Sequence, residues 1–229
     1  MFSRAKAGNF GAILTCMIMA ALLATPILRA QEQDRTQLRL QAMALEQKGQ
    51  NSEAEEIWAA MVKADARDAE ALAHLGLLSA REEHYVDAID YYRRAIAINS
   101  SLPGLQMNLG LALFKVGQFP DAVKYFTSEI KKHPGDLRLT ILLGMAHFEM
   151  KDYLVAIPYL QRATERDPQS LALYTTLAQS CLWSKQYPCV VKVQQQLVAL
   201  KEESAEVDSL AREALDQMHE GAAATEQQK

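Results

Sequence analysis

Apolar residues recur at helical spacing along most of the chain. Within residues 69–101, one run of them ends before the polar segment 81–84, and a second run begins after it. The first run consists of Leu72, Leu75 and Leu78, and the second of Tyr85, Ala88, Ile89, Tyr92 and Ile96. A recurrence every three to four residues is typical of an amphipathic helix. This stretch therefore predicts a helix, a tight turn and a second helix.

The same pattern returns along the chain at a constant period, without an insertion or a deletion. Small residues stand at Ala54, Ala88, Ala122 and Ala156; leucines followed by Gly or Ala stand at Leu75, Leu109, Leu143 and Leu177; and aromatic residues stand at Tyr85, Phe119, Tyr153 and Tyr187. One helix pair cannot bury its apolar face alone, whereas stacked pairs bury a continuous core. The period predicts a solenoid of helix pairs.

The residues from Ala69 to Ile96, with Gly76, Ala88 and Tyr92 at their places, closely resemble the tetratricopeptide repeat. The resemblance implies an all-α, right-handed superhelical solenoid of helix-turn-helix units. Within a repeat domain over 31–219 we expect five units, at 35–68, 69–102, 103–136, 137–170 and 171–204, and a capping helix at 205–219. Residues 220–229 predict a disordered tail. The fifth unit departs most, because Val190 and Gln194 replace the small and bulky residues of the others.

The first thirty residues have the three parts of a secretory signal peptide. Arg4 and Lys6 precede an apolar run over 10–24, which ends shortly before a polar segment that begins at Gln31. The run is shorter than the roughly 20 residues that span a membrane. We expect cleavage after Ala30 and a periplasmic or secreted protein. The alternative is an uncleaved anchor in which residues 10–28 hold the protein at a membrane.

Charge and composition exclude several classes of function. The chain carries 24 basic and 28 acidic residues, a net charge of −4, and loss of residues 1–30 would make it −7. Such a chain lacks the basic surface of a nucleic-acid-binding protein. No two histidines have zinc-protease spacing, and no Gly-rich phosphate loop or nucleophile elbow is present. We expect no catalytic residues, no metal, no cofactor and no small-molecule substrate.

The resemblance implies that the first helix of each unit lines a concave groove. In units two to four, the residues expected there are apolar and rich in methionine. They are Ala73, Leu77, Met107, Leu111, Phe114, Ile141, Met145 and Phe148. A contiguous apolar surface usually marks a partner site, and an amphipathic helix or an extended apolar peptide would fit it. The alternative is that these residues pack inside the superhelix or against the N-terminal segment.

These expectations favour an exported interaction scaffold that binds a protein or peptide partner in an envelope or secretion assembly. The alternative is a non-catalytic regulatory or positioning subunit of an envelope enzyme complex. An enzyme in its own right is disfavoured, because no acid, base or nucleophile set converges in the sequence.

Two local features add expectations of their own. Cys181 and Cys189 flank the predicted turn of the fifth unit, so their Cα atoms could lie within disulfide distance. The alternative is two ordinary buried cysteines. Pro158 falls inside the second helix of the fourth unit and predicts a kink, either tolerated on the convex side or serving as a hinge.

Overall fold

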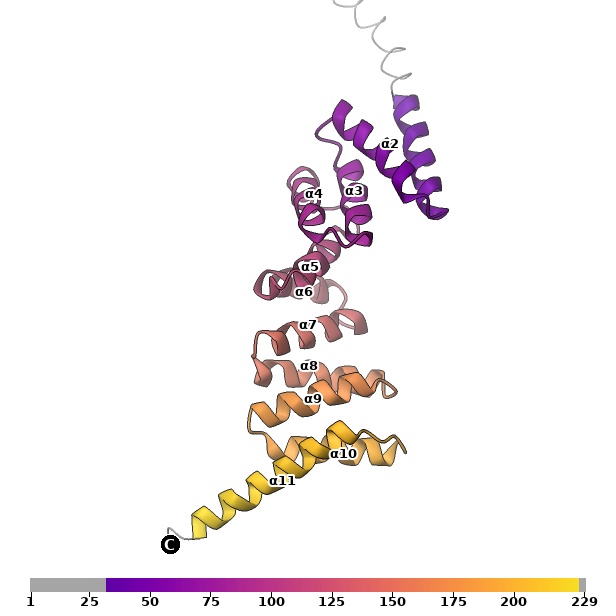
Figure 1. Cartoon of the computed structure of the whole chain (residues 1–229). Coiled ribbons are helices and arrows are strands. Elements are labelled where there is room, and N and C mark those ends of the chain that lie inside the picture. Colours follow the sequence, from indigo (N-terminus) through magenta and orange to yellow (C-terminus); the bar gives the residue numbers. More distant parts are fainter. Residues whose placement is uncertain (1–31, 227–229) are drawn as a thin grey trace, which may run out of the picture.

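A computed structural model describes residues 32–226, and in this part of the chain every element is a helix (Figure 1). A first helix over residues 32–47 is followed by α2 (Asn51–Ala64), α3 (Ala69–Arg81), α4 (Tyr85–Ile98), α5 (Leu105–Lys115), α6 (Phe119–Lys132), α7 (Leu137–Glu149), α8 (Tyr153–Arg166), α9 (Leu171–Trp183), α10 (Tyr187–Ala199) and α11 (Ala205–Glu226). The predicted all-α solenoid is confirmed. The predicted signal peptide lies outside the described residues.

The helices stack in the order of the chain. α3 packs on α4, α4 on α5, α5 on α6 and so on to α10, which gives the elongated array of Figure 1. The first helices of some units also touch, α3 with α5 and α7 with α9. α11 packs on α9 and α10 and then projects beyond them (Figure 1). The helix runs past His219, where the sequence analysis placed the end of the cap.

The repeated columns form the core. The alanines that recur at the repeat period, from Ala54 to Ala156, are fully buried. The recurring leucines, from Leu75 to Leu177, are almost fully buried. The glycines after those leucines let the two helices of a unit approach closely. A Cβ atom on Gly76 would lie 2.7 Å from the ring of Tyr92, and one on Gly110 would lie 2.7 Å from the ring of Phe126. Neither distance is tolerated between real atoms, so the packing itself requires glycine at these positions.

The turn inside each unit has one backbone conformation, which recurs with the same period as the core columns. Gly49, Glu83, Gly117, Lys151 and Lys185 all have a positive φ between 60° and 77°. At Glu83 the backbone N–H donates to Ala80, and the next N–H, of His84, donates to Ser79. This is the Schellman motif that ends a helix on a left-handed residue. Three of the five positions carry a side chain despite the conformational cost.

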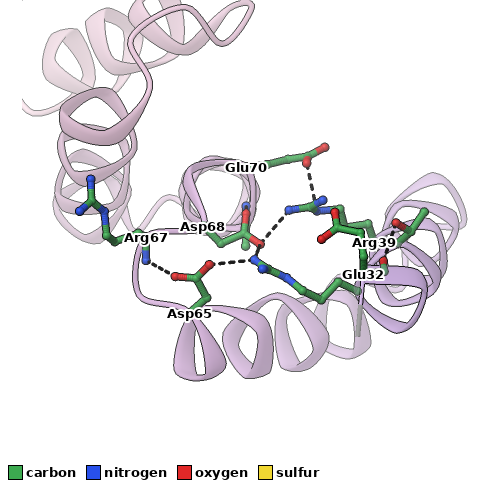
Figure 2. A network of polar contacts seen from close by, with 9 residues as sticks. Glu32, Arg39, Asp65, Arg67, Asp68 and Glu70 are labelled. Carbon is green, nitrogen blue, oxygen red and sulfur yellow. Dashed lines mark hydrogen bonds and ion pairs between the residues drawn. The ribbon is translucent and has the colours of Figure 1, made fainter. Parts of the chain in front are cut away.

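The first helix is held to the following unit by an ion-pair network (Figure 2). Asp68 accepts hydrogen bonds from Arg35 at 3.0 Å and from Arg39 at 2.9 Å, and it also caps α3 by accepting from the N–H of Ala71. Burial raises the pKa of Asp68, but these donors outweigh it, so that the pKa lies below its usual value. Arg39 lies in addition 3.1 Å from Glu70. The network holds the N-terminal end of the solenoid together.

A second polar contact joins the same two units. Glu46 accepts a hydrogen bond from the indole N–H of buried Trp58 at 2.7 Å, and its carboxylate lies 2.7 Å from Nδ1 of His74. The rings of Trp58 and His74 stack, with centroids 4.3 Å apart. A hydrogen-bonded stack of two rings therefore links the first unit to the second.

Two further predicted features have these outcomes. Helix α8 is continuous from Tyr153 to Arg166 with Pro158 inside it. Pro158 removes one helical hydrogen bond, and the carbonyl that loses its donor belongs to exposed Leu154, where water can replace the bond. In the fifth unit, Cys181 and Cys189 form a disulfide, with Cα atoms 5.7 Å apart.

No helix in residues 32–226 is long and apolar enough to cross a membrane.

Candidate partner-binding face

The eight predicted groove residues lie on α3, α5 and α7. We call the surface formed by α3, α5, α7 and α9, the first helices of four units, the first-helix face. All eight residues are partly exposed and none is fully buried. Ala73, Met107, Leu111 and Phe114 pack against the core of the middle units, and Ile141, Met145 and Phe148 pack against the core of the C-terminal units. Their remaining surface is open to a partner.

The two phenylalanines among these residues pack against other aromatic rings. Phe114 meets Phe119 edge-on, with ring centroids 5.2 Å apart. Phe148 meets Tyr153 in the same way at 5.8 Å and stacks on Trp183 at 5.5 Å. The contacts with Phe119 and Tyr153 join the end of a first helix to the start of the second helix in the same unit, and the contact with Trp183 joins α7 to the end of α9 in the next unit. Both phenylalanines therefore support the turn edge as well as the face.

Two of the eight residues, Leu77 and Leu111, line a cleft of about 330 Å³ between α3 and α5. Its apolar wall is completed by Ala80, Tyr85, Tyr92 and Ala112. Its polar lining consists of Arg81, Asn108, Lys115 and Arg138. The other six predicted residues do not line this cleft. We call it the central cleft.

The charges of the central cleft have one sign. Three of its lining residues are cationic and none is acidic. Arg81 lies 3.7 Å from a carboxylate oxygen of Glu46, so its charge is partly balanced. Within residues 32–220, neither Lys115 nor Arg138 belongs to an ion pair. An apolar wall beside unbalanced cations attracts a segment that carries both an apolar side chain and a carboxylate.

The tyrosine on the wall of the cleft does not change this charge. Burial raises the pKa of Tyr92, and the nearby charge of Arg81 lowers it by less. Tyr92 therefore stays neutral at any physiological pH. Ionisation of Tyr92 therefore does not offset the positive charge of the cleft.

The cations were missed as site residues by the sequence analysis. Arg81 and Lys115 are one repeat period apart, and each is the last residue of a first helix. In the next two units the same position holds Glu149 and Trp183. A comparison of units at this position would have found the two cations. Arg138 comes from the start of α7, and only the stacking of units brings it to the cleft.

The face ends at α11. The side-chain amide of Gln179 on α9 donates a hydrogen bond to Glu206 on α11 at 2.9 Å. Since α11 also packs on α9 and α10, it covers the first-helix face of the fifth unit. The accessible part of the face therefore spans α3 to α7.

Within the described residues, no three His, Cys, Asp or Glu side chains are grouped to hold a metal ion.

A family model described as tetratricopeptide repeat matches residues 39–103 and 107–170, which together make up more than half of the chain. The chain belongs to the tetratricopeptide repeat family. No curated protein matches it. The tetratricopeptide solenoid found here is the fold of several solved structures.

Three of those structures illustrate the likeness. MamA from Desulfovibrio magneticus RS-1 is 18% identical, with a TM-score of 0.63, over 78% of this chain and 96% of that one. YrrB, described as a tetratricopeptide repeat protein with an unusual peptide-binding site, is 16% identical, with a TM-score of 0.67, over 75% of this chain and 88% of that one. A tetratricopeptide repeat protein from Parabacteroides merdae is 15% identical, with a TM-score of 0.62, over 84% of this chain and 77% of that one. At these identities the likeness concerns the fold.

Proposed function

We propose that the protein is an interaction scaffold that binds a peptide or helical segment of a partner protein on its first-helix face. The observation that carries the proposal is the central cleft, where Leu77 and Leu111 stand beside Lys115 and Arg138. Apolar contact supplies the affinity and the cations select the sequence. The preferred segment combines a leucine or aromatic side chain with an aspartate or glutamate.

We further propose that the scaffold works outside the cytoplasm, in an envelope or secretion assembly. Support comes from the sequence of residues 1–30, in which the basic residues Arg4 and Lys6 precede a short apolar run, and from the polar segment that begins at Gln31. The disulfide of the fifth unit agrees with an oxidising compartment. Fractionation of the producing cells, with N-terminal sequencing of the purified protein, tests this. A mature N-terminus at Gln31 supports export, and an intact Met1 in the cytoplasmic fraction contradicts it.

Binding is tested with a panel of short synthetic peptides that pair leucine or phenylalanine with acidic, basic or neutral residues. Fluorescence anisotropy with the full chain should show a preference for the acidic peptides. The variant Leu111→Glu with Met145→Glu should lose that binding while its circular dichroism stays helical. The matched control is Val86→Glu, an exposed apolar position at the start of α4 outside the central cleft. Equal binding by both variants would refute the site.

A further inference from the structure

Two clefts adjoin one another along the first half of α8. One of about 420 Å³ lies at the turn edge, and its apolar lining consists of Tyr153, Leu154, Val155 and Trp183. The other, of about 560 Å³, lies between α6 and α8, and its apolar wall consists of Ile130, Pro134, Val155, Pro158 and Tyr159. Because the two clefts share Val155, we treat them as one surface and call it the α8 groove.

The fourth unit departs from its neighbours on this side of α8, where Val155 and Pro158 lie one turn apart. The residues at the corresponding places are charged: Asp87 and Asp90 in α4, and Asp121 and Lys124 in α6. An acidic residue in the first turn stabilises a helix by interaction with its dipole, and α8 has none there. The exchange of charged for apolar residues costs the free chain stability and solubility, and a partner that covers the apolar residues offsets this cost.

Pro158 also leaves a hydrogen-bond acceptor without its usual donor. Because proline has no N–H, the carbonyl of Leu154, four residues earlier, receives no helical hydrogen bond from residue 158. Leu154 lines the turn-edge cleft and Pro158 lines the larger cleft, so this carbonyl lies between residues of both. An extended peptide has free backbone N–H groups that can donate to such a carbonyl, whereas those inside a helix are already paired. This feature favours an extended segment over a helix.

The charges of the larger cleft indicate a second property of its ligand. Lys131 and Arg162 complete the lining of this cleft, and none of its lining residues is acidic. Both side chains belong to exposed residues, and within residues 32–220 neither takes part in an ion pair. At the turn edge, by contrast, Lys151 and Asp152 line the cleft with opposite charges. Unbalanced cations beside an apolar wall attract a carboxylate that stands next to an apolar side chain.

Trp183 gives the turn edge a rigid apolar wall. Its ring stacks on Phe148 at 5.5 Å and lies 5.1 Å from the ring of Tyr153, yet the residue is 50% exposed. The corresponding residues of the three preceding units are charged: Arg81, Lys115 and Glu149. A large ring that its neighbours already hold in place can receive an apolar side chain at a low cost in conformational entropy.

We propose that the α8 groove binds an extended segment of a partner protein, with two apolar side chains and an acidic residue beside the second. The first apolar side chain fills the turn-edge cleft beside Trp183, and the second fills the larger cleft beside Pro158. The acidic residue faces Lys131 and Arg162, while a backbone N–H between the two apolar side chains donates to the carbonyl of Leu154. The α8 groove shares no lining residue with the central cleft. The proposal is therefore independent of binding on the first-helix face, and one chain can hold two segments at once.

The probe is a set of synthetic peptides without tryptophan, in which two leucines are separated by different numbers of residues and aspartates follow the second leucine. The chain has two tryptophans, of which Trp58 is fully buried and Trp183 is half exposed, so a change in tryptophan emission reports on the α8 groove. The best peptide should shift the emission of the full chain to shorter wavelength. A peptide with a single leucine fills only one cleft and should need a concentration at least about tenfold higher.

Two variants test the groups assigned to the α8 groove. Pro158→Ala restores the helical donor to the carbonyl of Leu154, so it should weaken peptide binding about three- to tenfold although the fold gains stability. Lys131→Glu with Arg162→Glu should weaken binding at least about tenfold, and it should favour a peptide with lysines in place of the aspartates. Circular dichroism confirms that each variant is folded.

Matched controls exclude a general effect of charge and a contribution from the central cleft. Lys48→Glu with Lys63→Glu makes the same change in net charge at exposed positions of the first unit, outside both clefts. This variant should bind the two-leucine peptide like the wild type, and so should the central-cleft variant Lys115→Glu with Arg138→Glu.

The proposal is overturned if no peptide of the set shifts the emission of the wild-type chain, or if the wild type and both groove variants respond equally. A shift that appears with rising protein concentration alone would instead assign the groove to a second copy of the chain. A shift with anionic lipid vesicles but with no peptide would assign it to a membrane surface. Either of these results would also overturn the proposal.

Discussion

Replacement of Gly110 by leucine should destabilise the solenoid by at least about 2 kcal/mol, because it forces a side chain into a packed core. The first atom of the new side chain would lie 2.7 Å from Cε1 of Phe126 and 3.2 Å from Cβ of Tyr125. Phe126 is fully buried, so its ring is held by the surrounding core. Added atoms in a packed core cost about 1–3 kcal/mol, and leucine adds four carbons here. The better helix propensity of leucine returns less than about 1 kcal/mol.

The measurement is urea unfolding of the full chain followed by circular dichroism. The matched control is Gly135→Leu, because a Cβ at residue 135 would meet no atom within 4 Å. We expect the control to lie within about 0.5 kcal/mol of the wild type, as exposed substitutions do. An unchanged unfolding midpoint for Gly110→Leu would refute the helix pairing from which the cost was worked out.

A double-mutant cycle locates the clash. Phe126→Ala alone should cost about 3–5 kcal/mol, because it leaves a cavity in the core. In that background Gly110→Leu should cost less than it does in the wild type, with a coupling of about 0.5–3 kcal/mol. Additive effects of the two substitutions would show that residues 110 and 126 are not in contact.

Three further predictions concern other parts of the array. The pKa of Asp68 is lowered in the folded chain, so the ionised carboxylate should stabilise the fold fully above pH 3.8, and this stabilisation should decline as the pH falls below that value. Asp68→Asn should remove this part of the pH dependence of the free energy of unfolding. Pro158→Ala should raise stability by at least about 1 kcal/mol in urea unfolding, because it restores a helical hydrogen bond; a lower midpoint would mean that the ring is needed for packing. Protein from an oxidising compartment should show no free thiol at Cys181 or Cys189 after denaturation, and reduction should cost about 2–3 kcal/mol; two titratable thiols in the processed chain would contradict the disulfide.

Local periodicity was enough to predict the fold. Helix pairs, tight turns and close approach at Gly76 and Gly110 all follow from residues within one unit, and the constant period then stacks the units. These features depend on neighbours that are close in sequence, which is where patterns are informative.

The surfaces could be predicted only in part. Leu77 and Leu111 were expected on the groove, but Lys115 and Arg138 reach the central cleft from different helices, and their convergence depends on the packing of successive units. The left-handed backbone conformation at Glu83 and Lys151 was also not predicted, because glutamate and lysine do not indicate a positive φ. The cleft depends on the three-dimensional arrangement of the units, whereas the turn is local and only the glycines at the corresponding positions, Gly49 and Gly117, indicate it in the sequence.

The most direct test of the account is a charge exchange between the central cleft and a bound peptide. Lys115→Glu with Arg138→Glu reverses the two cations that belong to no ion pair within the described residues. By fluorescence anisotropy, this variant should bind an acidic apolar peptide at least about tenfold more weakly than the wild type does, and it should bind the same peptide with lysine in place of its acids more tightly. Equal affinity of the wild type and the variant for both peptides would contradict the claim that the central cleft selects the partner segment by its charge.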